Sequence, residues 1–254
     1  MCGRYASTKS ATDIADEFRA VDATGGDDPG PDYNVAPTKP MLAVVQRHPR
    51  DEEGTPDPDR TERSVRVMRW GLVPSWAKDP SVGSRMINAR SETATEKPAY
   101  RRAMQSRRCL IPAEGWYEWR REGSAKQPYF ITGGDGASLA MAGVWEFWRA
   151  ANGEGDPLIT AAVLTTDAVG ELINVHERMP LLIAPENWEA WLDPDTGADD
   201  ERVAAMLRPP APERVARMEL RPVSNLVNNV RNEGPELLRR TEEVEPILAL
   251  ELGK

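Results

Sequence analysis

The apolar segments of this chain are mostly short and strand-like, and Gly, Pro, Asn or Asp bounds most of them. Segments of this kind predict β-strands more readily than helices. The expected strands are Met41–Gln46, Val65–Trp70, Arg108–Ile111, Trp116–Arg120, Tyr129–Thr132, Leu139–Trp148, Leu158–Thr165 and one near Val215–Val223. Strands and helices do not alternate regularly, which argues against a doubly wound parallel sheet. The pattern therefore predicts an α+β fold with a mostly antiparallel, barrel-like β-sheet core flanked by short helices.

A few segments have helical character. The stretch from Ser10 to Asp13 resembles a capping box, and it opens an expected amphipathic helix from Thr12 to about Val21. The other expected helices are Glu92–Gln105, Ala168–Val175, Glu186–Leu192 and Glu201–Leu207. Residues 22–32 are expected to form a loop, and residues 49–63 an acidic surface insertion. The tail also contains a Val227–Arg231 segment and a last apolar piece at Ile247–Leu252. No repeat or linker divides the chain, so we expect residues 1–254 to form one domain.

The composition narrows the class of protein. The net charge of −9 argues against simple electrostatic binding of nucleic acid, and the acidic excess with few lysines is typical of adaptation to concentrated salt. Two cysteines provide neither a disulfide framework nor a metal-ligand cluster, so no metal or cofactor is expected. With no apolar stretch of about 18 residues and no leader pattern, we expect a soluble cytoplasmic protein without membrane contact.

The first residues carry the most distinctive chemistry. Met1 precedes Cys2, whose side chain is small enough for aminopeptidases to remove Met1. Cys2 would then hold a free α-amine and a thiol on one residue, with ordinary pKa values near ~8 and ~8.5. Such an aminothiol condenses with an aldehyde to an imine, and the thiol then closes a five-membered thiazolidine ring. The alternative is a frayed terminus with an incidental cysteine.

Three internal segments hold polar residues in apolar surroundings. Asn88 and Arg90 are two residues apart, so on an extended segment they share one face, although a turn and a salt bridge would also explain them. Glu118 lies among aromatic residues, where a buried carboxylate is costly unless it is paired or functional; on a half-exposed strand it would simply face water. His176 is a candidate for proton transfer or a structural histidine, and Cys109 is more typical of a core residue.

Several short blocks, taken in order, resemble one family. The blocks are Cys2–Tyr5, Tyr33–Pro37, Trp70–Trp76, Ile87–Thr93, Gly115–Trp119, Val175–Pro180 and Pro222–Val230. Together they make the chain, over roughly residues 2–240, similar to the SRAP (SOS-response-associated peptidase) family, whose members crosslink to abasic sites in single-stranded DNA.

The resemblance implies a role for individual residues. Cys2 would be the covalent nucleophile, Asn88 would orient it, Glu118 would position the amine and relay protons, and His176 would act as an acid on the sugar ring oxygen. The residues implied in DNA binding are Arg4, Pro37, Trp76, Arg90, Thr165 and Arg178. The implied partner is single-stranded DNA containing abasic sites, bound by a monomer.

Other functions remain open from the sequence. An N-terminal-nucleophile amidohydrolase also begins with Cys-Gly, but an Asn-Gly-Asp segment of the kind those enzymes use is lacking here. A peptidase, as the family name suggests, would use Cys2 to cleave amides. If Cys2 were blocked, the protein would bind single-stranded DNA without acting as an enzyme.

Overall fold

The strands of the protein form two sheets that meet around the amino-terminal segment. The computed structural model describes residues 2–123, 125–150, 153 and 155–242. Within them, the five-stranded sheet has the order β13 (Glu219–Pro222), β9 (Ala125–Thr132), β8 (Gly115–Glu122), β1 (Tyr5–Ser7) and β3 (Asp32–Val35). The eight-stranded sheet has the order β12 (Arg178–Pro180), β11 (Leu158–Asp167), β10 (Leu139–Trp148), β7 (Arg108–Ala113), β4 (Pro40–Arg47), β5 (Glu62–Trp70) and β2 (Val21–Asp22), with β6 (Asn88–Arg90) beside β11.

The eight-stranded sheet curls until it closes on itself. Strands β10, β7, β4 and β5 pair in succession with antiparallel neighbours, and β11 is antiparallel to β10. The ring closes where β11 also pairs with β5, in parallel, through Thr160 and Arg69. The expected α+β class with a mainly antiparallel sheet is therefore confirmed. The parallel closure could not be predicted, because it joins strands that are far apart in the sequence.

Short helices surround the sheets. They are α1 (Ala11–Phe18), α2 (Arg101–Ser106), α3 (Trp188–Leu192), α4 (Glu201–Met206) and α5 (Pro212–Val215), with 3₁₀ turns η1 (Pro80–Arg85), η2 (Gly170–Asn174), η3 (Pro185–Asn187), η4 (Asn225–Asn228) and η5 (Pro235–Leu238). The capping box of α1 is confirmed, since Ser10 and Asp13 bond reciprocally. The helix ends earlier than expected because Arg19 adopts a left-handed conformation with φ 52°.

Three expected elements differ from the structure. The helix expected at Glu92–Gln105 is wrong over its first half: residues 91–100 form turns, and α2 begins only at Arg101. Pro98 explains this, because it lacks an N–H and disfavours a helical residue before it. The expected strand Val215–Val223 is reduced to β13 and preceded by α5, and Ala168–Val175 contains only the 3₁₀ turn η2. The apolar piece at Ile247–Leu252 lies outside the described residues.

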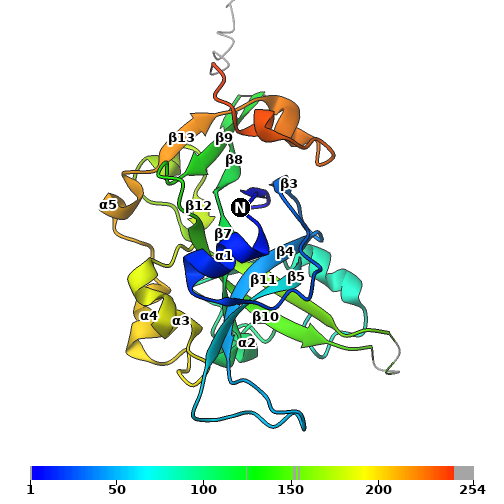
Figure 1. Ribbon diagram of the computed structural model, residues 1–254. Coiled ribbons are helices and arrows are strands. Elements are labelled where there is room, and N and C mark those ends of the chain that lie inside the picture. The colour runs from blue at the N-terminus through cyan, green and yellow to red at the C-terminus, as the bar shows by residue number, and fades with distance from the viewer. Residues whose placement is uncertain (1, 124, 151–152, 154, 243–254) are drawn as a thin grey trace, which may run out of the picture.

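The segment that begins at Cys2 lies inside the molecule. Cys2 is fully buried, and β1, which follows it closely, lies between β8 and β3 in the five-stranded sheet. Figure 1 shows the dark-blue start of the ribbon beside β3 and β8. The apolar surroundings of Cys2 include Trp70 and Trp116, one from each sheet. The packing of both sheets around the segment that begins at Cys2 argues against the frayed terminus considered above. In the described part of the chain, no helix is long and apolar enough to span a bilayer.

Candidate active site around Cys2

A hydrogen bond to its backbone carbonyl fixes the position of Cys2. The Asn88 side-chain nitrogen donates a hydrogen bond to the Cys2 carbonyl oxygen at 2.7 Å. Burial, reinforced by the negative charge of Glu118, raises the pKa of the Cys2 thiol well above its usual range. The thiol is thus protonated at neutral pH and needs a base before it can react as a thiolate.

Asn88 owes its position to β6, which confirms that this segment is extended. The strand pairs in parallel with β11, where Asn88 stands opposite Val163 and Arg90 opposite Thr165. The Asn88 side-chain oxygen is buried and receives no hydrogen bond from a described residue. A buried amide oxygen without a donor is uncommon in folded proteins, and it is available to a substrate hydroxyl or amine.

Glu118 lies on β8 and faces the same side as Trp116, because side chains two residues apart share a strand face. Only 3% of the residue is exposed, so the alternative in which it simply faces water is wrong. Burial raises the pKa of its carboxyl to about 7, an effect that the positive charge of the amino terminus partly offsets. A carboxyl with this pKa exchanges protons readily near neutrality, as a general acid or base must.

His176 follows η2 and has a fixed tautomer. The backbone N–H of Arg178 donates to its Nδ1 at 2.9 Å, so the neutral ring carries its proton on Nε2. Burial, followed by the positive charge of the amino terminus, lowers the pKa of His176. The ring is therefore mostly neutral at pH 7 and presents Nε2–H as a donor.

Four of the residues predicted to bind DNA are accessible to different degrees. Trp76 is 66% exposed in the loop after β5, and the Arg90 side chain is exposed at the end of β6. Pro37 is half-buried in the turn that leads to β4. Arg4 is half-buried as well, and it donates through one terminal nitrogen to Asn34 at 2.8 Å and to the Val227 carbonyl at 3.0 Å. Its second terminal nitrogen makes no hydrogen bond to a described residue.

The other two predicted DNA contacts, Thr165 and Arg178, lie below the surface. Thr165 is 1% exposed and Arg178 6% exposed. The Arg178 guanidinium pairs with Glu92 at 2.7 Å and with Asp167 at 2.5 Å, and it donates to the Thr165 carbonyl at 2.7 Å. In this arrangement the Arg178 guanidinium is already paired with two carboxylates. The phosphate contact that the resemblance implies for these two residues stays a prediction, and it requires the pairing of Arg178 with Glu92 and Asp167 to open.

Asn34 is a residue to which the sequence reasoning assigned no role. Its side chain is fully buried, and its amide nitrogen lies within hydrogen-bond distance of the carbonyls of Val227, Asn229 and Asn232, at 3.4, 3.1 and 3.1 Å. Arg4 donates to Asn34, and Asn34 in turn bonds to Asn229, which lies 195 residues after it in the sequence. Asn34 thus connects the amino-terminal strand region to a segment near the end of the described chain. The only signal in the sequence was a polar residue beside apolar ones at the start of a motif block.

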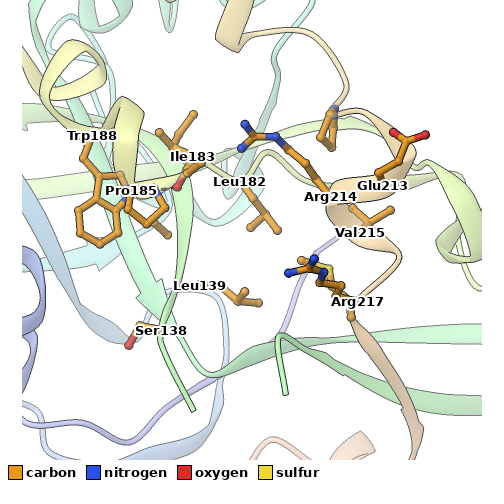
Figure 2. Close-up of a pocket in the computed structure, with 14 residues that line it drawn as sticks. Ser138, Leu139, Leu182, Ile183, Pro185, Trp188, Glu213, Arg214, Val215 and Arg217 are labelled. Carbon is orange, nitrogen blue, oxygen red and sulfur yellow. Dashed lines mark hydrogen bonds between the residues drawn. The ribbon is translucent and has the colours of Figure 1, made fainter. Parts of the chain in front are cut away.

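The pocket in Figure 2 is distinct from this site. Its volume is about 420 Å³, and its lining includes Trp188, Leu139, Leu182 and Arg217. None of the predicted site residues lines it. Among the described residues, no group of three or more His, Cys, Asp or Glu side chains is placed to hold a metal ion.

Comparison with known proteins connects this geometry to a family. The model of the family "SOS response associated peptidase (SRAP)" matches residues 1–230. The chain is 37% identical over 239 residues to the abasic site processing protein YoaM of Bacillus subtilis, covering 94% of this chain and 97% of that protein. It is 32% identical over 273 residues to the abasic site processing protein HMCES of Xenopus tropicalis, covering 94% and 78%. A crystal structure of a Bacteroides thetaiotaomicron protein shares the fold, with a TM-score of 0.75, 24% identity and coverage of 95% and 100%.

Proposed function

The chain belongs to the SOS response associated peptidase family, and from this premise we propose that it processes abasic sites in single-stranded DNA by covalent capture. In this proposal Met1 is removed, and the amine and thiol of Cys2 form a thiazolidine with the aldehyde of the ring-opened abasic sugar. The observation that carries the proposal is the environment of Cys2: the Asn88 amide donates a hydrogen bond to its backbone, and the negative charge of buried Glu118 contributes to the raised pKa of its thiol.

The reaction divides into two balanced steps. The Cys2 amine adds to the aldehyde carbon, and loss of one water leaves an imine. The thiol sulfur then adds to the imine carbon while the imine nitrogen takes a proton, so the ring closes without further loss of atoms. Because the second step is intramolecular, it gains the effective concentration of a well-oriented pair.

Glu118 and His176 supply and remove protons in these steps. Ionised Glu118 takes a proton from the ammonium and returns it to the hydroxyl that leaves as water. Ionised again, it takes the proton of the thiol, whose raised pKa makes a base necessary, and passes it to the imine nitrogen. His176 donates through Nε2–H to the sugar ring oxygen, which favours the open aldehyde. The unsatisfied oxygen of Asn88 orients the amine or its addition product.

The DNA strand is held next to Cys2 by side chains of two kinds. Arg4 and Arg90 bind phosphates, and exposed Trp76 packs on a base beside the lesion, which suits binding without sequence preference. Pro37 forms part of the pocket floor. Arg178 and Thr165 reach a phosphate only if the pairing of Arg178 with Glu92 and Asp167 opens.

A denaturing gel tests the proposal. The protein without Met1 is mixed with an abasic oligonucleotide, with the intact oligonucleotide and with one carrying a tetrahydrofuran analogue, which lacks the aldehyde. We expect a heat-stable adduct with the abasic strand alone. Cys2→Ser should abolish it, although borohydride should still trap an imine, and Cys109→Ser serves as the matched control with the other buried cysteine. Cleavage of amide or peptide substrates without any DNA adduct would instead identify an amidohydrolase or peptidase.

A further inference from the structure

Residues 224–232, which we name the 224–232 segment, form a rigid surface beside Arg4. Figure 1 shows this part of the chain close to β3 and β8, on the side where the chain begins. The segment contains η4 and makes bonds within itself: Asn232 donates to the Leu226 carbonyl at 2.8 Å, and Asn228 to the Asn225 side chain at 3.1 Å. The segment is therefore ordered before any ligand arrives.

Buried polar side chains fasten the 224–232 segment to the site. Asn34 contacts its carbonyls at Val227, Asn229 and Asn232 and accepts a hydrogen bond from Arg4 at 2.8 Å. Trp119 of β8 donates through its indole nitrogen to the Asn228 side chain at 2.7 Å. An ordinary surface loop does not need a fully buried amide devoted to it, because water satisfies its carbonyls.

The 224–232 segment exposes two apolar side chains and one cationic side chain to solvent. Leu226 is 52% exposed and Val230 43% exposed, and both belong to the small group of bulky apolar side chains that are exposed in the described part of the protein. Arg231 is exposed, and its guanidinium makes no hydrogen bond or ion pair with a described residue. Aliphatic side chains such as Leu can pack against bases, and a cation beside them can neutralise a phosphate.

We propose that the 224–232 segment is a second contact surface for the DNA strand, in which Leu226 and Val230 pack against bases flanking the lesion and Arg231 binds a phosphate. The identity of the strand rests on the proposed function. Single-stranded DNA is the occupant because the segment is continuous with Arg4, whose guanidinium bonds to the Val227 carbonyl at 3.0 Å. Because the surface is already ordered, binding there loses little conformational entropy.

Reversible binding to the tetrahydrofuran oligonucleotide, which cannot form an imine, tests this surface. Fluorescence anisotropy gives the dissociation constant over a range of salt. Leu226→Ser combined with Val230→Ser should weaken binding about tenfold, because two apolar side chains lose the area that they bury against the bases. The dependence on salt should not change, because an apolar contact releases no counterions. Arg231→Ala should instead reduce the log-log salt slope by about 0.7.

Val21→Ser is the matched control. Val21 is 46% exposed, much like Val230, but it lies on the edge strand β2 of the other sheet, so its replacement should leave binding unchanged. The inference is overturned if the Leu226/Val230 double variant binds within about twofold of the wild type, or if the wild type does not bind the oligonucleotide. A wild type that binds but never crosslinks to an abasic strand would refute the proposed function and leave this surface standing.

Discussion

Replacing Glu118 by Gln should make the protein more stable at alkaline pH while slowing its chemistry. The carboxyl is 3% exposed, and burial raises its pKa to about 7, against an ordinary value of 4.5. An unfolded chain would keep the lower value. Between these two pKa values the folded protein binds more protons than the unfolded chain, so stability falls as pH rises from about 4.5 to about 7 and stays low above it.

The size of the effect follows from the pKa difference. About 2.5 pKa units at about 1.4 kcal/mol each give a cost of about 3 kcal/mol at pH 8, which is absent below about pH 4.5. Glutamine has nearly the same shape and cannot ionise. Glu118→Gln should therefore stabilise the fold by about 3 kcal/mol at about pH 8 and have little effect at about pH 4.5.

Denaturant unfolding of the wild type and Glu118→Gln at both pH values measures this difference. Glu146→Gln is a suitable control, because Glu146 is also buried but pairs with Arg107 at 3.0 Å. Its replacement should destabilise the protein, since it leaves the arginine without a partner. The same Glu118→Gln protein should crosslink abasic DNA at least several-fold more slowly. A Glu118→Gln protein that is equally or less stable than the wild type at pH 8 would refute the reasoning.

Three further variants test the other roles. His176→Ala should slow crosslinking and change its pH profile while leaving reversible affinity for DNA nearly unchanged, as gel kinetics and anisotropy would show. A wild-type crosslinking rate across about pH 6–8 would contradict the role of His176 in proton transfer. Arg90→Ala should weaken reversible binding and reduce the salt slope by about 0.7, with the crosslinking rate at saturating DNA retained; an unchanged slope would mean that Arg90 holds no phosphate. Trp76→Ala should weaken reversible DNA binding most in about molar salt, where phosphate contacts are screened and stacking carries more of the affinity. A loss of affinity confined to low salt would exclude stacking by Trp76.

The sequence predicted the strands well because their signals are local. Apolar runs and bounding turn residues place β4, β5, β10 and β11 close to where the structure has them. The helix expected at Glu92–Gln105 forms only from Arg101 onward, because Pro98 interrupts the segment. Ring closure through Thr160 and Arg69 could not be foreseen, since no local pattern encodes which distant strands will pair.

The candidate site was predictable as a set of residues but not as an arrangement. The motif blocks identified Cys2, Asn88 and Glu118, yet their contacts depend on strands from both sheets. The sequence did not reveal which of these side chains are buried. A motif does not tell whether an arginine faces solvent, and Arg178, expected to contact DNA, is paired with two carboxylates. Nor did the sequence indicate a role for Asn34, whose buried amide bonds to backbone carbonyls of the 224–232 segment.

Intact-mass spectrometry of the reaction between the protein and an abasic oligonucleotide tests the central claim most directly. The two forms of the chain, with and without Met1, are compared under identical conditions. The aminothiol account predicts an adduct of the Met1-free chain whose mass equals protein plus DNA minus one water and which survives heating without reductant. The chain that retains Met1 has no amine on Cys2, so it should give none. A heat-stable adduct from the Met1-retaining chain, or no adduct from the Met1-free chain, would contradict the account.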